Sequence, residues 1–146
     1  MSRPPRGLYL AEPPQHYLVR PSLVVDCSVL AGLLFQEHWL VEAQARIAGH
    51  SLKAPWLLDH ELANVAVKKH RAGFTELAND GLVAYADMDL ERFETSPSDV
   101  YALATRYQLS AYDAAYLWLA AELTCPLATF DEKLATAAKA HLSSLP

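Results

Sequence analysis

Short apolar or β-branched segments alternate with longer segments of helical periodicity along most of this chain, and this alternation leaves few possible folds. The strand-like segments are residues 22–26 (SLVVD), 51–55 (SLKAP), 82–88 (LVAYADM) and 125–130 (CPLATF). The segments between them are long enough for helices that cross over from one parallel strand to the next. The sequence therefore predicts an α/β fold in which helices cover both faces of a mainly parallel sheet.

The predicted helices start at residues that favour a helix N-terminus. Pro55 suits the first turn of the helix predicted for residues 56–73, and Ser96 is typical of a helix start because a proline follows it. Ser110 and Asp113 have the spacing of a capping box. Helices are predicted for residues 28–50 with a break near His38, 56–73, 74–80, 98–108, 111–123 and 131–141.

A single domain is expected, because 146 residues suit one core of ordinary size. Five of the nine prolines lie within residues 1–21, so we interpret that segment as an extended N-terminal arm and residues 22–146 as the domain. No apolar stretch approaches the roughly 18 residues that span a bilayer, and the arm lacks the pattern of a secretory signal. A cytoplasmic location without a membrane partner is expected.

Cysteines and net charge exclude few functions. Cys27 and Cys125 are too few for a disulfide framework and lack metal-site spacing, so both are expected to be buried thiols. The formal net charge of -5 argues against a generally basic nucleic-acid-binding surface. A local basic patch remains compatible with that charge.

Two carboxylates follow strand-like segments, Asp26 after residues 22–25 and Asp131 after the segment CPLATF. Ligands bind beyond the carboxyl ends of the strands in parallel sheets, which makes both acids candidate site residues. Asp113 lies in the first turn of one predicted helix and Glu61 in the second turn of another. These positions allow the four acids to converge on one site.

Each acid also has a purely structural interpretation. Asp26 can cap the helix that follows it, Asp131 can complement a helix dipole, and Asp113 fits the N3 position of a capping box. Glu61 lies in the segment HELAN, which resembles the start of an HExxH zinc helix, but Asn64 stands where the second histidine is required. The sequence therefore does not favour a zinc site there.

Four segments together resemble one family. VVDCSVL, PWLLDHELANVAVK, LSAYDAAYLWLA and PLATFDEKLA are similar, in order and spacing, to the motifs of PIN-domain ribonucleases, especially the VapC-type toxins of bacterial toxin–antitoxin pairs, over about residues 22–141. The residues at the family's functional positions are Asp26, Glu61, Asp113 and Asp131 for the acids, Ser28 and Thr129 for the hydroxyls, and Asn64 for a polar side chain.

The resemblance implies a three-layer α/β/α fold around a central, mainly parallel sheet of about four to five strands. The chain departs from the family pattern in two places. Its proline-rich arm is longer than usual, and residues 141–146 (HLSSLP) are a poor version of the family's final strand. These departures concern the arm and the edge of the sheet and leave the acidic set intact.

Neighbouring carboxylates need a cation. Two like charges about 5 Å apart repel by roughly 3 kcal/mol at an effective dielectric of about 20, so such a cluster holds protons or binds a metal ion. All-oxygen ligands suit Mg²⁺ or Mn²⁺, which support phosphodiester hydrolysis. By the family pattern, Asp26 and Asp113 are the principal metal ligands and Asp131 is a further or water-mediated ligand. Glu61 then orients water or transfers a proton.

The resemblance also implies the partners, which are an RNA substrate, a second copy in a homodimer, and a small antitoxin whose C-terminal segment wraps the toxin. The basic residues that could guide an RNA backbone are Lys53, Lys68, Lys69, Arg71 and Lys133. A basic helix end is also typical of a solvent-exposed terminus that complements the helix dipole. The residues alone do not distinguish RNA from DNA.

Other functional classes match parts of the pattern. A haloacid-dehalogenase-type enzyme needs an acid two residues after Asp26, where this chain has Ser28. A receiver-type signalling domain needs a lysine after its last strand, for which Lys133 is a loose match. A PIN-fold binding module without catalysis, or another metal-dependent nuclease, stays open. Retention of the four acids argues against the non-catalytic module.

Overall fold

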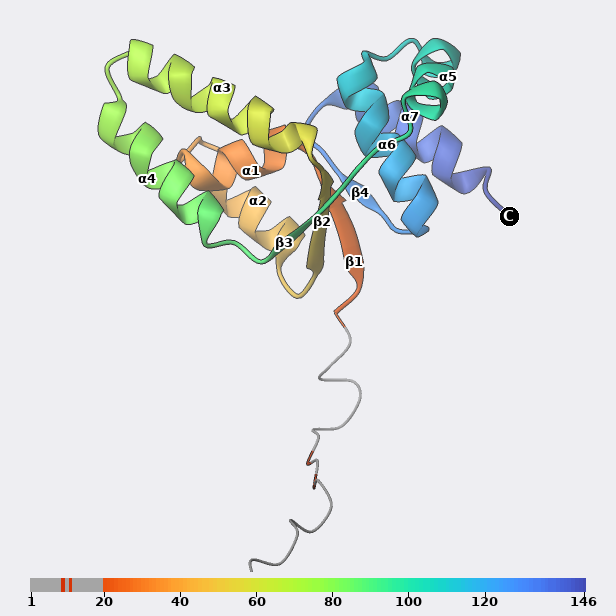
Figure 1. The fold of residues 1–146 in the computed structure, drawn as a ribbon, viewed down its shortest axis with the longest axis horizontal. Helices are drawn as coiled ribbons and strands as arrows, with labels where there is room; N and C mark the ends of the chain where they lie inside the picture. The colour runs from red at the N-terminus through yellow and green to blue at the C-terminus, as the bar shows by residue number, and fades with distance from the viewer. Residues whose placement is uncertain (1–8, 10, 12–19) are drawn as a thin grey trace, which may run out of the picture.

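The computed structural model describes residues 9, 11 and 20–146, and its fold is shown in Figure 1. Within these residues the chain forms four strands and seven helices. The strands are β1 (Ser22–Val25), β2 (Ser51–Pro55), β3 (Leu90–Phe93) and β4 (Leu127–Ala128). The helices are α1 (Cys27–Leu34), α2 (Leu40–Ile47), α3 (Leu57–Arg71), α4 (Thr75–Ala86), α5 (Pro97–Tyr107), α6 (Ala111–Leu123) and α7 (Glu132–Ser143). Most of the arm predicted for residues 1–21 lies outside the described residues.

All neighbouring strands pair in parallel, in the order β3-β2-β1-β4. The register sets Leu23 of β1 beside Leu52 of β2 and Val25 beside Ala128 of β4. Successive parallel strands must be joined by crossover connections, and helices occupy each of these connections. The described residues therefore confirm the predicted parallel α/β fold.

Helices cover both faces of this sheet (Figure 1), with α1 to α4 on one side and α5 to α7 on the other. The connection from β1 to β2 carries α1 and α2, and the connection from β2 to β3 carries α3 and α4. The chain then returns through α5 and α6 to β4 and ends with α7. The arrangement is the predicted three-layer α/β/α fold.

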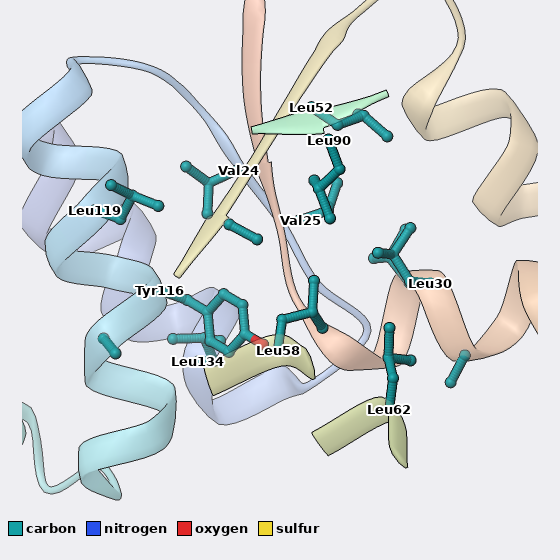
Figure 2. Close-up of a cluster of buried hydrophobic side chains, with 14 of the residues drawn as sticks. Val24, Val25, Leu30, Leu52, Leu58, Leu62, Leu90, Tyr116, Leu119 and Leu134 are labelled. Atoms are coloured by element: carbon teal, nitrogen blue, oxygen red, sulfur yellow. The ribbon is translucent and has the colours of Figure 1, made fainter. Parts of the chain in front are cut away.

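The core follows the alternation of side chains along β1. Val24 points toward Leu119 of α6, whereas Val25 lies on the other side of the strand, toward Leu30 of α1 (Figure 2). Both valines are 0% exposed. A strand that is buried on both faces consists of consecutive apolar residues, which explains the unbroken run before Asp26.

Helix boundaries mostly follow the predicted signals. The break near His38 is confirmed, since α1 ends at Leu34 and α2 begins at Leu40. α5 begins with Pro97 in its first turn, and Ser110 caps α6 through its side chain. Local capping chemistry therefore places most of the helices.

The third strand is the main correction to the sequence prediction. The strand predicted over residues 82–88 is wrong, because most of these residues belong to α4, whose buried residues have helical spacing. The true third strand is β3, with the sequence LERF. Its charged residues have partners elsewhere, since Glu91 accepts from Lys53 Nζ at 2.5 Å and Arg92 Nε donates to Asp59 at 2.8 Å. A strand stabilised by such pairs does not show the apolar run by which strands are found.

Smaller corrections concern the ends of elements. Pro55 ends β2 and does not open α3, which begins at Leu57. The strand predicted over residues 125–130 is only two residues long. Within residues 20–146 no strand follows α7, so residues 141–146 do not add a fifth strand to the sheet. None of the helices in this range is both long and apolar enough to span a bilayer.

Candidate functional site

The order of the strands reverses between β1 and β4. The chain runs outward from β1 through β2 to β3 and then returns to place β4 on the other side of β1. Parallel α/β sheets bind ligands beyond the strand ends at such a switch point. Asp26 directly follows β1, and Thr129 and Asp131 follow β4, so both predicted strand-end acids lie where a ligand is expected.

Asp26 is 5% exposed, and its hydrogen-bond donors among the described residues are all neutral. Its Oδ1 atom accepts from Ser28 Oγ at 2.6 Å and from the Val29 backbone N–H at 3.2 Å, and its Oδ2 atom accepts from the Thr129 hydroxyl. The Val29 bond makes Asp26 the N-cap of α1. Burial raises the pKa of Asp26 despite these bonds, and the charge of Asp113 raises it further.

Glu61 reaches the same region from the second turn of α3, and Tyr116 of α6 fixes its position. The Tyr116 side chain is almost fully buried in the core (Figure 2), and its hydroxyl donates to Glu61 Oε1 at 2.5 Å. Burial raises the pKa of Glu61, the bond from Tyr116 opposes this shift, and the charges of Asp26 and Asp113 add to it. Three carboxylates from three elements therefore act on one another through their charge.

Asp113 lies in the first turn of α6, where its backbone N–H donates to Ser110 Oγ at 3.1 Å. This bond is one half of the predicted capping box. Burial and then the charge of Asp131 raise the pKa of Asp113, while Ser110 and the charge of Lys133 lower it in part. Asp113 is thus both a residue of a helix cap and a member of an acidic set.

Two hydroxyls join the loops that follow β1 and β4. Ser28 Oγ accepts from the Phe130 backbone N–H at 2.9 Å, and Thr129 Oγ1 accepts from the Asp131 N–H at 2.9 Å. Asp131 Oδ1 in turn accepts from the Leu134 N–H at 2.7 Å and caps α7. The bond between Ser28 and Phe130 and the bond between Thr129 and Asp26 hold the two strand ends together. We call Asp26, Glu61, Asp113 and Asp131 the acidic edge.

Comparison with known protein families identifies the family of this chain. The family model described as "PIN domain" matches residues 23–140. This chain belongs to the PIN-domain family. PIN domains are generally metal-dependent nucleases, which agrees with an acidic set at the ends of parallel strands.

Among solved structures, the PIN domain described here is similar to the crystal structure of PAE2754 from Pyrobaculum aerophilum. The TM-score is 0.59 at 19% sequence identity, and the match covers 85% of this chain and 94% of that chain. At this identity the likeness concerns the fold. No curated protein matches the sequence.

Nucleases of the PIN-domain family usually use divalent metal ions. Among the described residues, no three His, Cys, Asp or Glu side chains lie close enough together to form a complete metal site by themselves. Mg²⁺ keeps several waters and is usually bound through only one or two carboxylates, so it does not require such a cage. An all-oxygen set in which neighbouring negative charges raise the pKa of Asp26, Glu61 and Asp113 fits this kind of ion.

Two of the basic residues predicted to guide RNA already have acidic partners. Lys53 Nζ lies 2.5 Å from Glu91 Oε2, and Lys69 pairs with Glu37. Their charges are thereby partly neutralised. Neither pair belongs to the acidic edge, so these two lysines are the weaker candidates for phosphate contacts.

Lys68 and Lys133 act on the acidic edge or on its neighbours. The charge of Lys133 lowers the pKa of Asp113. The charge of Lys68 acts to lower the pKa of Cys27, against the larger effects that raise it. Burial, followed by the charges of Glu61 and Asp26, raises the pKa of Cys27 to about 12. Cys27 and Cys125 are half-buried free thiols and are less buried than predicted.

Sequence reasoning missed Tyr116. The feature that could have identified Tyr116 is its position three residues after Asp113 in a mostly apolar helix, because this spacing places both residues on one helix face. Asn64, which was predicted, lines a hollow of about 570 Å³ together with Glu61 and Tyr112. That hollow opens the glutamate side of the acidic edge to solvent.

Proposed function

We propose that this PIN domain is a Mg²⁺- or Mn²⁺-dependent endoribonuclease that hydrolyses RNA phosphodiester bonds at Asp26, Glu61, Asp113 and Asp131. The observation that carries the proposal is the environment of Asp26. This carboxylate is 5% exposed, the charge of Asp113 raises its pKa, and its donors within the described residues are neutral. A divalent cation would supply the missing compensation.

The side chains divide the work as follows. Asp26 and Asp113 would hold the ion, and Asp131 would hold it directly or through water. An ion held there would acidify a water molecule and neutralise charge on the phosphate. Because Tyr116 holds Oε1 of Glu61, the Oε2 atom is the one that orients the attacking water and takes its proton. Ser28 and Thr129 position Asp26 through the hydrogen bonds of their hydroxyls.

RNA is the proposed substrate, and Lys68 and Lys133 are the proposed contacts to its backbone. The charge of Lys133 acts on Asp113 of the acidic edge, and the charge of Lys68 acts on Cys27, the residue after Asp26. Both lysines therefore lie where a phosphate would approach. We further propose that the chain is the toxin of a toxin–antitoxin pair, acts in the cytoplasm as a homodimer, and is inhibited by a small antitoxin. The motifs LSAYDAAYLWLA and PLATFDEKLA support this assignment by their resemblance to VapC-type toxins.

Metal dependence tests the chemistry. Purified protein should cleave structured RNA in Mg²⁺ or Mn²⁺, stop in excess chelator, and recover when the metal is restored. A DNA substrate of the same sequence should remain intact, which separates a ribonuclease from another metal-dependent nuclease. Cleavage that continues in excess chelator would contradict the metal mechanism, and binding of RNA without cleavage in any metal would favour a non-catalytic binding module.

Growth tests the biological role. Expression of the chain without an antitoxin should arrest growth, whereas expression of Asp26→Asn at the same level should not. Equal growth arrest by both proteins would point away from nuclease action. Growth unaffected by either protein, together with metal-dependent cleavage in vitro, would leave a ribonuclease that is not a toxin.

A further inference from the structure

A hollow of about 560 Å³ adjoins the acidic edge on the side of α2. Its walls are Ser28, His38, Trp39, Glu42, Phe130 and Asp131. Ser28 is bonded to Asp26, and Asp131 belongs to the acidic edge itself. A substrate phosphate at the acidic edge would therefore place the neighbouring nucleotide beside this hollow.

Trp39 forms a wall whose position is fixed. Its Nε1 atom donates to the Ser28 carbonyl oxygen at 3.1 Å, which ties the indole to the loop after β1. The ring lies against Gly32 of α1, where a Cβ atom would collide with Cδ1 and Nε1 of Trp39. Glycine at this position is thus required for the indole to approach the helix. The ring is set in place before any ligand arrives.

Phe130 and His38 complete an aromatic surface around Trp39. The Phe130 ring centroid lies 6.2 Å from that of Trp39 with the planes inclined by 53°, and the His38 ring meets Trp39 edge-on at 4.5 Å. Phe130 is 37% exposed although it is large and apolar. Its backbone is held by Ser28, so the exposed ring is presented by a fixed loop. The packing of Trp39 does not by itself require the Phe130 ring to be exposed to solvent.

We propose that this hollow binds one unpaired nucleobase of the RNA beside the scissile phosphate, and that it prefers guanine. The inference rests on the proposed function and adds to it the identity of a neighbouring base. Flat aromatic rings are the surfaces on which unpaired bases stack. The carboxylate of Glu42 repels phosphate, so the base enters the hollow and the backbone stays outside it.

Glu42 gives the hollow its preference among bases. A carboxylate only accepts hydrogen bonds, and two donors side by side can bind both of its oxygens. Guanine presents N1–H and N2–H₂ side by side on its Watson–Crick edge. Uracil presents a single N–H between two carbonyl oxygens, which a carboxylate repels. Glu42 is exposed on α2, so it can meet the edge of a base that stacks on the rings.

The test measures binding apart from cleavage. Fluorescence anisotropy follows a labelled six-nucleotide oligouridine, the same strand with guanosine at each position in turn, and the same strand with an abasic residue at each position. Ca²⁺ replaces Mg²⁺, and gel analysis confirms that the strands stay intact. Phe130→Ala and Glu42→Gln are compared with two matched control variants at exposed positions outside the hollow, Phe74→Ala and Glu76→Gln.

At one position of the strand, the RNA with guanosine should bind the protein about 10-fold more tightly than the RNA with an abasic residue there, as expected for one stacked base. Phe130→Ala should remove this difference between guanosine and the abasic residue, and Glu42→Gln should reduce the preference for guanosine over uridine. The two control variants should bind as the wild type does. If all four variants unfold as the wild type does, loss of the fold is excluded as the cause.

Each other outcome overturns the inference in a distinguishable way. If RNA binds and is cleaved but Phe130→Ala and Glu42→Gln behave as the wild type, the hollow is not a base site and the proposed function stands. Uridine bound as tightly as guanosine would overturn the base preference. No RNA binding, combined with no cleavage in Mg²⁺ or Mn²⁺, would overturn the proposed function together with this inference.

Discussion

Asp26 and Asp59 are both aspartates near strand ends, yet of the two only Asp59 has a cationic partner among the residues that the structure describes. Asp59 Oδ1 accepts from Arg92 Nε at 2.8 Å and from the Tyr85 hydroxyl at 2.6 Å. The Arg92 guanidinium also lies over the Tyr85 ring, 4.9 Å from its centroid. Asp26 accepts only from neutral groups among the described residues.

The pKa values of the two aspartates move in opposite directions. Burial acts to raise the pKa of Asp59, but the hydrogen bonds from Tyr85 and Arg92 and the charge of Arg92 outweigh it and lower the pKa. Burial raises the pKa of Asp26, and no arginine or lysine of the described residues offsets this shift. A carboxylate that stabilises the fold is thus compensated by an arginine of this chain, whereas in our proposal a metal ion compensates Asp26.

Activity should show the largest difference between the two aspartates. Asp26→Asn should reduce the rate of RNA cleavage by more than the roughly 10–100-fold that loss of an outer-shell partner costs a metal site. Asp59→Asn should leave the rate per folded molecule unchanged. Single-turnover cleavage in saturating Mn²⁺ measures both rates. Equal losses in the two variants would erase the proposed distinction.

Without metal, the free energy of unfolding should fall in Asp59→Asn but not in Asp113→Asn. Asp59→Asn should lower the free energy of unfolding by about 1 kcal/mol, because Arg92 loses its charged partner at a partly exposed site. Asp113→Asn removes one charge from a set that repels itself, so it should be as stable as the wild type or more so. Urea unfolding in chelator measures both. Destabilisation by Asp113→Asn would indicate that Asp113 acts mainly as a helix-cap residue.

The pH dependence of the Asp59 contribution should be the smallest effect. The pKa of Asp59 is lowered in the folded protein from an ordinary value of 3.8, so its stabilisation is present above that value. It is lost as the pH falls through the lowered pKa. The difference in unfolding free energy between wild type and Asp59→Asn should therefore be constant near neutral pH and shrink in acid. A difference that grew in acid would contradict the assigned sign.

The sequence predicted those parts of the molecule that depend on local pattern. Three of the four strands were found because their residues are apolar or β-branched, and Asp26 and Asp131 were placed at strand ends for the same reason. β3 was missed because two of its four residues are charged, and the partner of Arg92, Asp59, lies 33 residues away. Such long-range pairs leave no periodic signal in the sequence.

The candidate site shows the same division. Glu61 was identified from a motif, whereas its partner Tyr116 lies 55 residues away on another helix. The aromatic surface around Trp39 depends on the absence of a side chain at Gly32. Both features require the packing of separate elements, which the spacing of residues within one segment does not reveal.

The most direct test of the proposal that the acidic edge binds a divalent cation is the effect of metal on the stability of the protein. Thermal unfolding is recorded for wild type, Asp113→Asn and the matched control Asp59→Asn, each in chelator and in millimolar Mn²⁺. Mn²⁺ should stabilise wild type and Asp59→Asn equally, by about 2.7 kcal/mol if its concentration is 100 times Kd, and Asp113→Asn much less. Equal stabilisation of all three proteins, or none in the wild type, would contradict the account.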